Sequence, residues 1–301
     1  MNGFLNILKP PGMTSHDVVA FVRKTVCIKK VGHTGTLDPE AAGVLPICVG
    51  KATKAVQYII DGKKAYRANI KFGTATDTQD RYGKILSEKY VSDVKVEDLQ
   101  NIIQQFIGKI QQTPPLYSAI KHEGKRLYQY AYEGKQPLVK NREIEIFDIV
   151  IIDKLNNKEF ILDIFCSKGT YVRTLCNDIG IISGYGAHMS QLVRLESYPF
   201  KIDESLTLEE ISLTAQNNSI ENALKSLDYV FEGYKKIEVK DTAKKRALNG
   251  NTLYDNDVNE KKYEHGNNLR LYVDEQFIGI GEAGYDEAKK RDYIKIKTLF
   301  V

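Results

Sequence analysis

The feature that most constrains the fold is the spacing of apolar residues, which changes irregularly along the chain between that of a strand and that of a helix. Residues 66–72 alternate strictly between apolar and polar side chains, as a half-buried strand does. Residues 96–107 instead carry apolar side chains at helical spacing and stop at Gly108. Further strands are expected at residues 4–8, 142–152 and 159–166. Because strands and helices mix without a regular βαβ rhythm, we expect an α+β fold.

A second change of pattern, near residue 232, divides the chain. Before it, helices are expected over residues 15–26, with Ser15 as the cap and four valines on the buried side, and over residues 206–229. From residue 234 onward the pattern is that of short strands. These strands are expected at residues 237–239, 269–273, 277–280 and 293–296. We therefore predict two domains, residues 1–232 and residues 233–301.

The net charge of +4 is unremarkable, but basic residues gather in one segment. From residue 109 to residue 142 there are seven basic side chains, two acidic ones and four tyrosines. Cations interleaved with aromatic rings suit phosphate neutralisation beside base stacking. A solvated surface helix with extended lysine side chains has the same composition. Composition alone therefore leaves both interpretations open.

Several classes of protein are disfavoured by what the chain does not contain. Its four cysteines form no close pair, which argues against a zinc site or a disulfide framework. The N-terminal residues lack the pattern of a secretory signal, and no apolar run approaches the roughly 18 residues of a membrane span. We expect a soluble cytoplasmic protein that makes no membrane contact. The cysteines are Cys27, Cys48, Cys166 and Cys176.

Two glycine motifs resemble nucleotide-binding loops, and we reject both. Residues 279–284 match G-x-G-x-x-G, but the flanking pattern is that of a hairpin and too little chain follows for a second strand with its acidic residue. Residues 43–52 faintly resemble a P-loop, but the gap is too long and Ala52 replaces the hydroxyl that would bind Mg²⁺. Neither motif implies a cofactor.

The stretch GHTGTLDPEAAGVLP, residues 32–46, is the most informative one. Asp38 followed by Pro39 is typical of a helix start, with aspartate as the N-cap. The glycines Gly32, Gly35 and Gly43 allow the backbone to approach a ligand closely, so the loop suits a pocket floor. Residue chemistry alone does not identify the ligand.

This stretch resembles the signature of the TruB family, the stand-alone bacterial tRNA pseudouridine-55 synthases. Five further segments resemble motifs of the same family and occur in the same order. They are residues 6–17, 64–78, 113–128, 166–175 and 186–195. The resemblance implies a mixed, mainly antiparallel catalytic sheet with a mobile thumb insertion at about residues 109–142. The C-terminal part is similar to a small PUA-type RNA-binding domain in length and strand content.

The resemblance also implies roles for single residues. Asp38 would be the catalytic carboxylate and Arg173 its partner, while the ring of Tyr66 would pack on the target base. Tyr171 and Leu192 would line the pocket, and His33 would fill the stack that the flipped base leaves. Asp38 can attack C1′, remove a ribose proton or stabilise positive charge on the ribose, and these three roles stay open. RNA contacts are expected from Lys9, Lys121, Lys125 and Arg126.

The family's reaction needs neither a metal nor a cofactor, so we expect none. The expected partner is the T-arm hairpin of tRNA, with no obligatory protein partner and a monomeric chain. Two alternatives remain. One is a non-catalytic protein that binds or folds tRNA on the same scaffold. The other is the RNA-guided relative of archaea and eukaryotes, which is similar around the aspartate.

Overall fold

The structure is a computed structural model that describes residues 1–60, 62–260 and 263–301. Its larger sheet has nine strands, and seven of them form the row β1-β3-β12-β4-β11-β10-β7, while β2 pairs with β3 and β13 with β12. In that row the strands are β1 (Gly3–Lys9), β3 (Ala42–Val49), β12 (Ala187–Ser197), β4 (Lys64–Phe72), β11 (Glu159–Cys166), β10 (Arg142–Asn156) and β7 (Gly108–Gln112), and the two outside it are β2 (Val31–His33) and β13 (Phe200–Lys201). Only β3 and β12 pair in parallel within this described sheet, which confirms a mixed, mainly antiparallel α+β fold.

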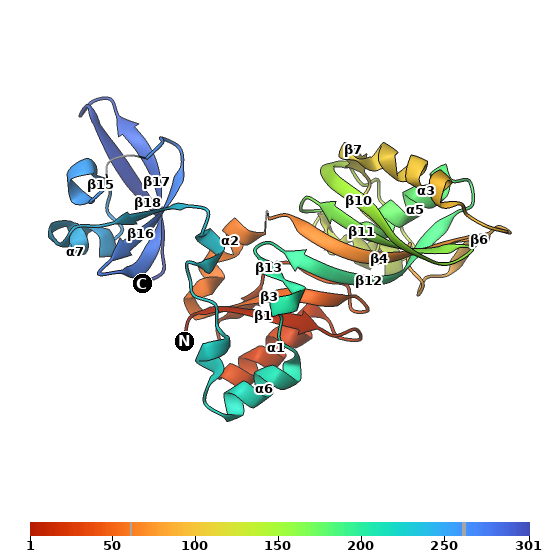
Figure 1. Cartoon of the computed structure of the whole chain (residues 1–301), viewed down its shortest axis with the longest axis horizontal. Coiled ribbons are helices and arrows are strands. Elements are labelled where there is room, and N and C mark those ends of the chain that lie inside the picture. Colours follow the sequence, from red (N-terminus) through yellow and green to blue (C-terminus); the bar gives the residue numbers. More distant parts are fainter. Residues whose placement is uncertain (61, 261–262) are drawn as a thin grey trace.

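Two groups of helices cover this sheet (Figure 1). Helices α1 (Ser15–Val26) and α6 (Leu208–Gln216) lie beside β1 and β3, with Val18, Val22 and Ile211 fully buried. Helices α3 (Val96–Ile103) and α5 (Val172–Ile182) cover the other end, where the apolar faces of β4, β11 and β10 form the largest core cluster. The short helix α2 (Val56–Ile59) precedes β4.

The predicted helices are correct in place but differ in detail. Thr14, not Ser15, caps α1: its hydroxyl accepts from the Asp17 N–H at 3.1 Å, while the Asp17 carboxylate accepts from the Thr14 N–H at 2.8 Å. The helix expected over residues 206–229 ends at Gln216, because Asn218 takes a left-handed φ of 53°, and only short 3-10 turns follow. Residues 104–106 likewise form a 3-10 turn after α3.

The chain leaves the larger sheet after Gln112 and returns to it at Arg142, at the same place. Gln112 at the end of β7 pairs with Arg142 at the start of β10, so the intervening chain projects from one edge of the sheet. It contains the strands β8 (Lys121–His122) and β9 (Lys125–Arg126) and the helix α4 (Leu127–Tyr132). We call residues 109–142 the thumb-like segment. A second small hairpin, β5 (Thr74–Thr76) and β6 (Ile85–Glu88), follows β4.

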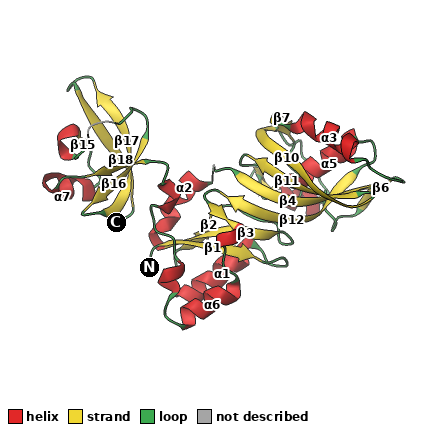
Figure 2. Ribbon diagram, viewed as in Figure 1, coloured by secondary structure: helices red, strands yellow, loops and turns green. Residues whose placement is uncertain are grey.

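The chain after residue 232 forms a second sheet with the strand order β14-β16-β17-β18-β15 (Figure 2). Its elements are β14 (Lys235–Glu238), α7 (Lys244–Leu248), β15 (Leu253–Tyr254), β16 (Asn268–Val273), β17 (Gln276–Asp286) and β18 (Arg291–Leu299). The module, blue in Figure 1, packs on the larger body through a hydrophobic cluster in which its Ile280 and Phe300 join Phe4, Phe200 and Phe231.

Both rejected glycine motifs lie in structures that cannot serve as nucleotide loops. Residues 279–284 are part of β17, which continues into β18 without a helix. Residues 43–52 run along β3 into the 3-10 turn Gly50–Ala55. None of the helices in the described part of the chain has the length and apolar content of a membrane span.

Candidate active site

Asp38 lies in a turn between β2 and β3, not at a helix start as the Asp-Pro pair predicts. The Ala41 N–H donates to the Asp38 carbonyl at 3.1 Å, and β3 begins at the next residue. An aspartate followed by proline suits a tight turn as well as a helix cap. Here β3 must start at Ala42 to pair with Val193 of β12, so no helix has room to form.

The Asp38 turn is held from below by Lys9, whose side chain is fully buried. Its ammonium donates to the carbonyls of Pro10, Met13 and Pro39 at 2.8, 2.6 and 2.8 Å. Burial lowers the pKa of Lys9 to about 8. The prediction that Lys9 contacts RNA is therefore wrong, because its three donors are engaged and no atom reaches the surface. Lys9 instead joins the 10–13 turn to the turn that carries Asp38.

Ser15 and Arg194 secure the same loop at two further points. The Ser15 hydroxyl donates to the Leu37 carbonyl at 3.2 Å and accepts from the Leu37 N–H at 2.9 Å. Arg194 is 1% exposed and donates to the carbonyls of Val44 at 2.7 Å and Gly35 at 3.2 Å. The chain is thus fixed on both sides of Asp38, which leaves the carboxylate little freedom to move.

Arg173 and Asp38 form an ion pair, although 135 residues separate them. The Nε atom of Arg173 lies 2.9 Å from Asp38 Oδ2, and Nη2 lies 3.4 Å from Oδ1. The arginine side chain is 7% exposed and the aspartate side chain 44% exposed. A buried planar fork therefore orients a carboxylate that still faces solvent.

The remaining donors of Arg173 attach it to two other segments. It donates to the carbonyls of Thr78 and Tyr117, both at 3.1 Å, and lies 3.5 Å from Asp80 Oδ2. These acceptors surround the guanidinium and restrict its orientation. Arg173 joins α5, the loop between β5 and β6, and the thumb-like segment around Asp38.

These residues border a pocket of about 670 Å³, a volume typical of small-ligand sites. Asp38, Arg173 and Leu192 all belong to its wall, and Leu192 is 9% exposed. The other residues of the wall are Pro11, Pro39, Glu40, Ala41, Ala42, Thr78, Asp80, Arg81, Tyr82, Tyr117, Met189, Ser190, Gln191 and Val193. The wall combines an apolar side with the charged group formed by Arg173, Asp38 and Asp80, which suits a flat ring attached to a polar group.

Tyr66 and Tyr171 support this pocket without forming its wall. Tyr66, 8% exposed, pairs across the sheet with Arg194, and burial raises the pKa of its hydroxyl. The neighbouring Arg194 offsets part of this rise in the pKa of Tyr66, but the pKa stays above its ordinary value, so the phenol is neutral at pH 7. Tyr171 is half-buried directly before α5, and burial also raises its pKa.

His33 lies outside the pocket wall, on β2. Its ring packs edge-on against that of His16 at 5.4 Å between centroids. Burial, followed by the nearby His16 and Arg194, lowers the pKa of His33 to about 4. The ring is therefore uncharged at neutral pH, and its buried Nδ1 has no hydrogen-bond partner among the described residues.

The predicted RNA-binding side chains Lys121, Lys125 and Arg126 are exposed on the thumb-like segment. Lys121 pairs with Arg126 across the β8–β9 hairpin. Lys125 contacts Glu133 at 2.8 Å and lies 5.9 Å above the ring of Tyr130. An exposed cation beside a half-buried aromatic ring is compatible with a nucleic-acid surface.

Three residues of the site escaped the sequence interpretation: Asp80, Tyr117 and Arg194. Tyr117 and Arg194 lie in segments that resemble the family and Asp80 lies two residues after one, but no spacing distinguishes any of them from its neighbours. Arg194 falls on an alternating strand, where an arginine is normally a surface residue. Among the described residues, no group of three or more His, Cys, Asp or Glu side chains is arranged to hold a metal ion.

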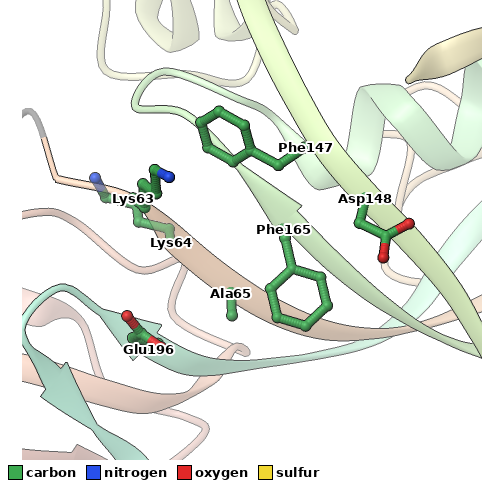
Figure 3. Close-up of a pocket in the computed structure, with 7 residues that line it drawn as sticks. All are labelled: Lys63, Lys64, Ala65, Phe147, Asp148, Phe165 and Glu196. Carbon is green, nitrogen blue, oxygen red and sulfur yellow. The ribbon is translucent and has the colours of Figure 1, made fainter. Parts of the chain in front are cut away.

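A second hollow, of about 370 Å³, lies on the opposite face of the sheet (Figure 3). Ala65 and Phe165 form a cross-strand pair there, and successive strand residues point to opposite faces, so their neighbours Tyr66 and Ile164 face the other side. Figure 3 shows the rings of Phe147 and Phe165 beside the hollow. It shares no residue with the Asp38 pocket and contributes nothing to it.

Comparison with known proteins confirms the family that the sequence motifs predict. The model of the N-terminal domain of TruB family pseudouridylate synthases matches residues 23–172, and that of the tRNA pseudouridylate synthase B C-terminal domain matches residues 173–232. The chain is 45% identical over 300 residues to tRNA pseudouridine synthase B of Alkaliphilus oremlandii, covering 99% of this chain and 98% of that protein. The chain belongs to the TruB family of pseudouridylate synthases.

Two further similarities agree with this assignment. The tRNA pseudouridine synthase B of Clostridioides difficile is 42% identical over 303 residues, covering 99% of this chain and 98% of that protein. Among solved structures, one chain in the crystal structure of a Cbf5-Nop10-Gar1 complex has a TM-score of 0.75 and 25% identity, covering 99% of this chain and 85% of that one.

Proposed function

We propose that this protein isomerises uridine to pseudouridine at position 55 in the T-arm of tRNA, with Asp38 as the catalytic carboxylate. One observation carries the proposal: a half-exposed aspartate is held by a buried arginine at 2.9 Å in the wall of a pocket large enough for a base. Its relatives, 41–45% identical, are tRNA pseudouridine synthases B.

The reaction breaks the bond from C1′ to N1, rotates the uracil and joins C1′ to C5, with a proton leaving C5 and one arriving at N1. The substrate is neither oxidised nor reduced, so the reaction requires a positioned carboxylate and no redox group. The Asp38 carboxylate can attack C1′, remove a ribose proton or stabilise positive charge on the ribose. Deuterium at C2′ separates proton removal from the other two roles, because a large primary isotope effect is expected only if that proton is removed.

Supporting roles follow from burial and charge. Tyr66 is neutral and packed beside the site, which favours contact with the base through its ring over action as a base at pH 7. Leu192 supplies the apolar wall. His33 carries no charge at neutral pH, so its ring can replace a flipped base in the stack without losing an ionic partner.

RNA binding is assigned to two parts of the chain. The thumb-like segment offers exposed cations beside tyrosines and would close on the T-arm hairpin, reading its shape and phosphates. The module of residues 233–301 would act as a PUA-like RNA-binding domain beside the catalytic domain of residues 1–232. We propose a monomer that works on tRNA in the cytoplasm without an obligatory protein partner.

The decisive experiment uses the purified chain and an unmodified tRNA transcript. Wild-type protein should form pseudouridine, detected by mass spectrometry or by reverse-transcription stops after carbodiimide treatment. Asp38→Asn should bind tRNA with unchanged affinity and lose on the order of 10³-fold or more in rate. Glu40→Gln is the matched control, since Glu40 is an exposed carboxylate in the same pocket wall. Normal product from Asp38→Asn would refute the assignment of Asp38.

An RNA-guided enzyme is the second candidate, because the fold resembles a Cbf5 chain with a TM-score of 0.75. That candidate requires a guide RNA for turnover. Product formation by the purified chain alone would exclude it, whereas activity only with an added guide would favour it. Binding of tRNA without any turnover would instead favour a non-catalytic tRNA-folding protein.

A further inference from the structure

Gln112 makes a buried, two-way contact with the start of α5. It is the last residue of β7, where the thumb-like segment leaves the sheet, and it is 2% exposed. Its Nε2 donates to the Tyr171 carbonyl at 3.1 Å, and its Oε1 accepts from the Tyr171 N–H at 2.8 Å. One side-chain amide thus forms hydrogen bonds with both the backbone N–H and the backbone carbonyl of a residue 59 positions away.

Tyr171 is the residue at which this contact has most effect. It is the N-cap of α5, and its own side chain makes no capping hydrogen bond. Its carbonyl accepts the first helical bond, from the Leu175 N–H at 3.0 Å, as well as the bond from Gln112. Helix termini leave backbone groups without partners, so the Gln112 amide takes the place of a local cap and fixes the helix start to the sheet.

Arg173 lies two residues after this N-cap, in the first turn of α5. The thumb-like segment therefore contacts that turn twice, through Gln112 and through the Tyr117 carbonyl that accepts from Arg173 at 3.1 Å. The helix α4 is attached to the same root, because the Tyr128 N–H donates to the Ser118 carbonyl at 3.1 Å. Hydrogen bonds and the Tyr117–Ser118 peptide bond thus connect α4 to Arg173, and Arg173 contacts Asp38.

We propose that Gln112 is a positioning residue that sets the place of Arg173, and that it couples the root of the thumb-like segment to the Asp38 carboxylate. The proposal rests on the pseudouridine synthase activity proposed above. Gln112 touches neither the substrate pocket nor Asp38 and acts only through the start of α5. Since an error of about 1 Å in a catalytic group can cost about 100-fold in rate, the effect on turnover should be large.

Three variants test the idea in the full-length protein. Gln112→Leu keeps the volume and removes both hydrogen bonds, and Gln112→Glu keeps an acceptor for the Tyr171 N–H but places an oxygen against its carbonyl. Thr113→Val is the matched control, because the Thr113 hydroxyl donates to Asn141 Oδ1 at 2.7 Å across the same root and makes no hydrogen bond to α5 among the described residues. We expect the two Gln112 variants to lose about 10- to 100-fold in single-turnover rate with tRNA affinity changed less than about 3-fold. Thr113→Val should resemble wild type.

A double-mutant cycle distinguishes positioning of Arg173 from general damage. With excess enzyme, slow single-turnover rates stay measurable in an Arg173→Ala background. If Gln112 acts through Arg173, Gln112→Leu should cost less than about 2-fold in that background, since contacts in one network are not additive. A full, multiplied loss would overturn the proposal, as would wild-type rates in both Gln112 variants.

A spectroscopic measurement reports the geometry without turnover. Arg173 Nε lies 2.9 Å from Asp38 Oδ2, so the Nε–H of this ion pair should give a separate arginine ¹⁵N–¹H signal that disappears in Arg173→Lys. That signal should shift or broaden in Gln112→Leu and remain in Thr113→Val. An unchanged signal would overturn the proposal even if the rate fell. If the proposed pseudouridine synthase activity itself were wrong, the result would be different, because wild-type protein would then form no pseudouridine at all.

Discussion

Gly43 packs so closely on Arg194 that a Cβ atom at residue 43 would lie 2.3 Å from the Arg194 carbonyl oxygen and 2.5 Å from its nitrogen. The two residues are partners in the parallel pairing of β3 with β12. Gly43 also has a φ of 113°, which a residue with a side chain rarely adopts. This contact fixes where the Asp38 turn ends and where the sheet begins again.

Gly43→Ala should therefore be severely destabilising, by about 3 kcal/mol, because both the backbone conformation and the space exclude a methyl group. Gly35→Ala is the control on the other side of Asp38. Its Cβ would meet only Arg194 Nη1 at 3.7 Å, an ordinary contact, so its free energy of unfolding should stay within about 1 kcal/mol of wild type. Urea denaturation measures both. Equal stability of the two variants would contradict this account of the β3–β12 contact.

Lys9→Met should destabilise the protein by about 3 kcal/mol and lower turnover, because three carbonyls lose the donor that joins them. Lys30→Met, at an exposed lysine, serves as the control and should change little. A variant as stable and active as wild type would show that the 10–13 turn does not need Lys9.

The lowered pKa of Lys9 predicts that the free energy of unfolding depends on pH. Burial lowers the pKa of Lys9 in the folded chain to about 8 from 10.5. Between these values the unfolded chain binds the proton more tightly, so the contribution of Lys9 to the free energy of unfolding rises from pH 8 to pH 10.5. A ¹⁵N titration of the Lys9 ammonium should show a midpoint near pH 8, and a midpoint above 10 would contradict the burial argument.

His33 should make the protein less stable as the pH falls. Its folded pKa, about 4, lies below the ordinary value of 6.5, so the unfolded chain binds a proton more tightly in that window. The free energy of unfolding should fall from pH 6.5 toward pH 4, and His33→Gln should remove this part of the dependence. Denaturation at pH 7 and pH 5 measures it. His33→Phe should keep tRNA affinity at pH 7, because the ring acts uncharged, and a large loss there would argue for a polar role.

The cations of the thumb-like segment should set the salt dependence of tRNA binding. Arg126→Ala and Lys125→Ala should each weaken binding and reduce the slope of log Kd against log salt by about 1 if each contacts a phosphate. Lys158→Ala, in the exposed turn between β10 and β11, is the control of equal charge. An unchanged slope in both thumb variants would place the RNA elsewhere.

Much of the fold follows from local pattern. The alternation of residues 66–72 and the helical spacing from residue 96 marked β4 and α3, because side-chain periodicity depends on which face each element buries. The family, too, follows from ordered motifs along the chain. Boundaries were less accurate: the Thr14 cap, the end of α6 and the Asp38–Pro39 turn depend on hydrogen bonds or strand pairing that residue types alone do not specify.

The geometry of the site depends on contacts between distant segments. Local pattern showed that Asp38 lies in a glycine-containing loop, but not that the loop is fixed by Lys9 and Arg194, or that Arg173 lies 2.9 Å from its carboxylate. Lysine and arginine are surface residues on average, so burial of their charges becomes visible only when the folded chain supplies the carbonyl acceptors. Those acceptors belong to residues up to 159 positions away, and only packing of the sheet brings them together.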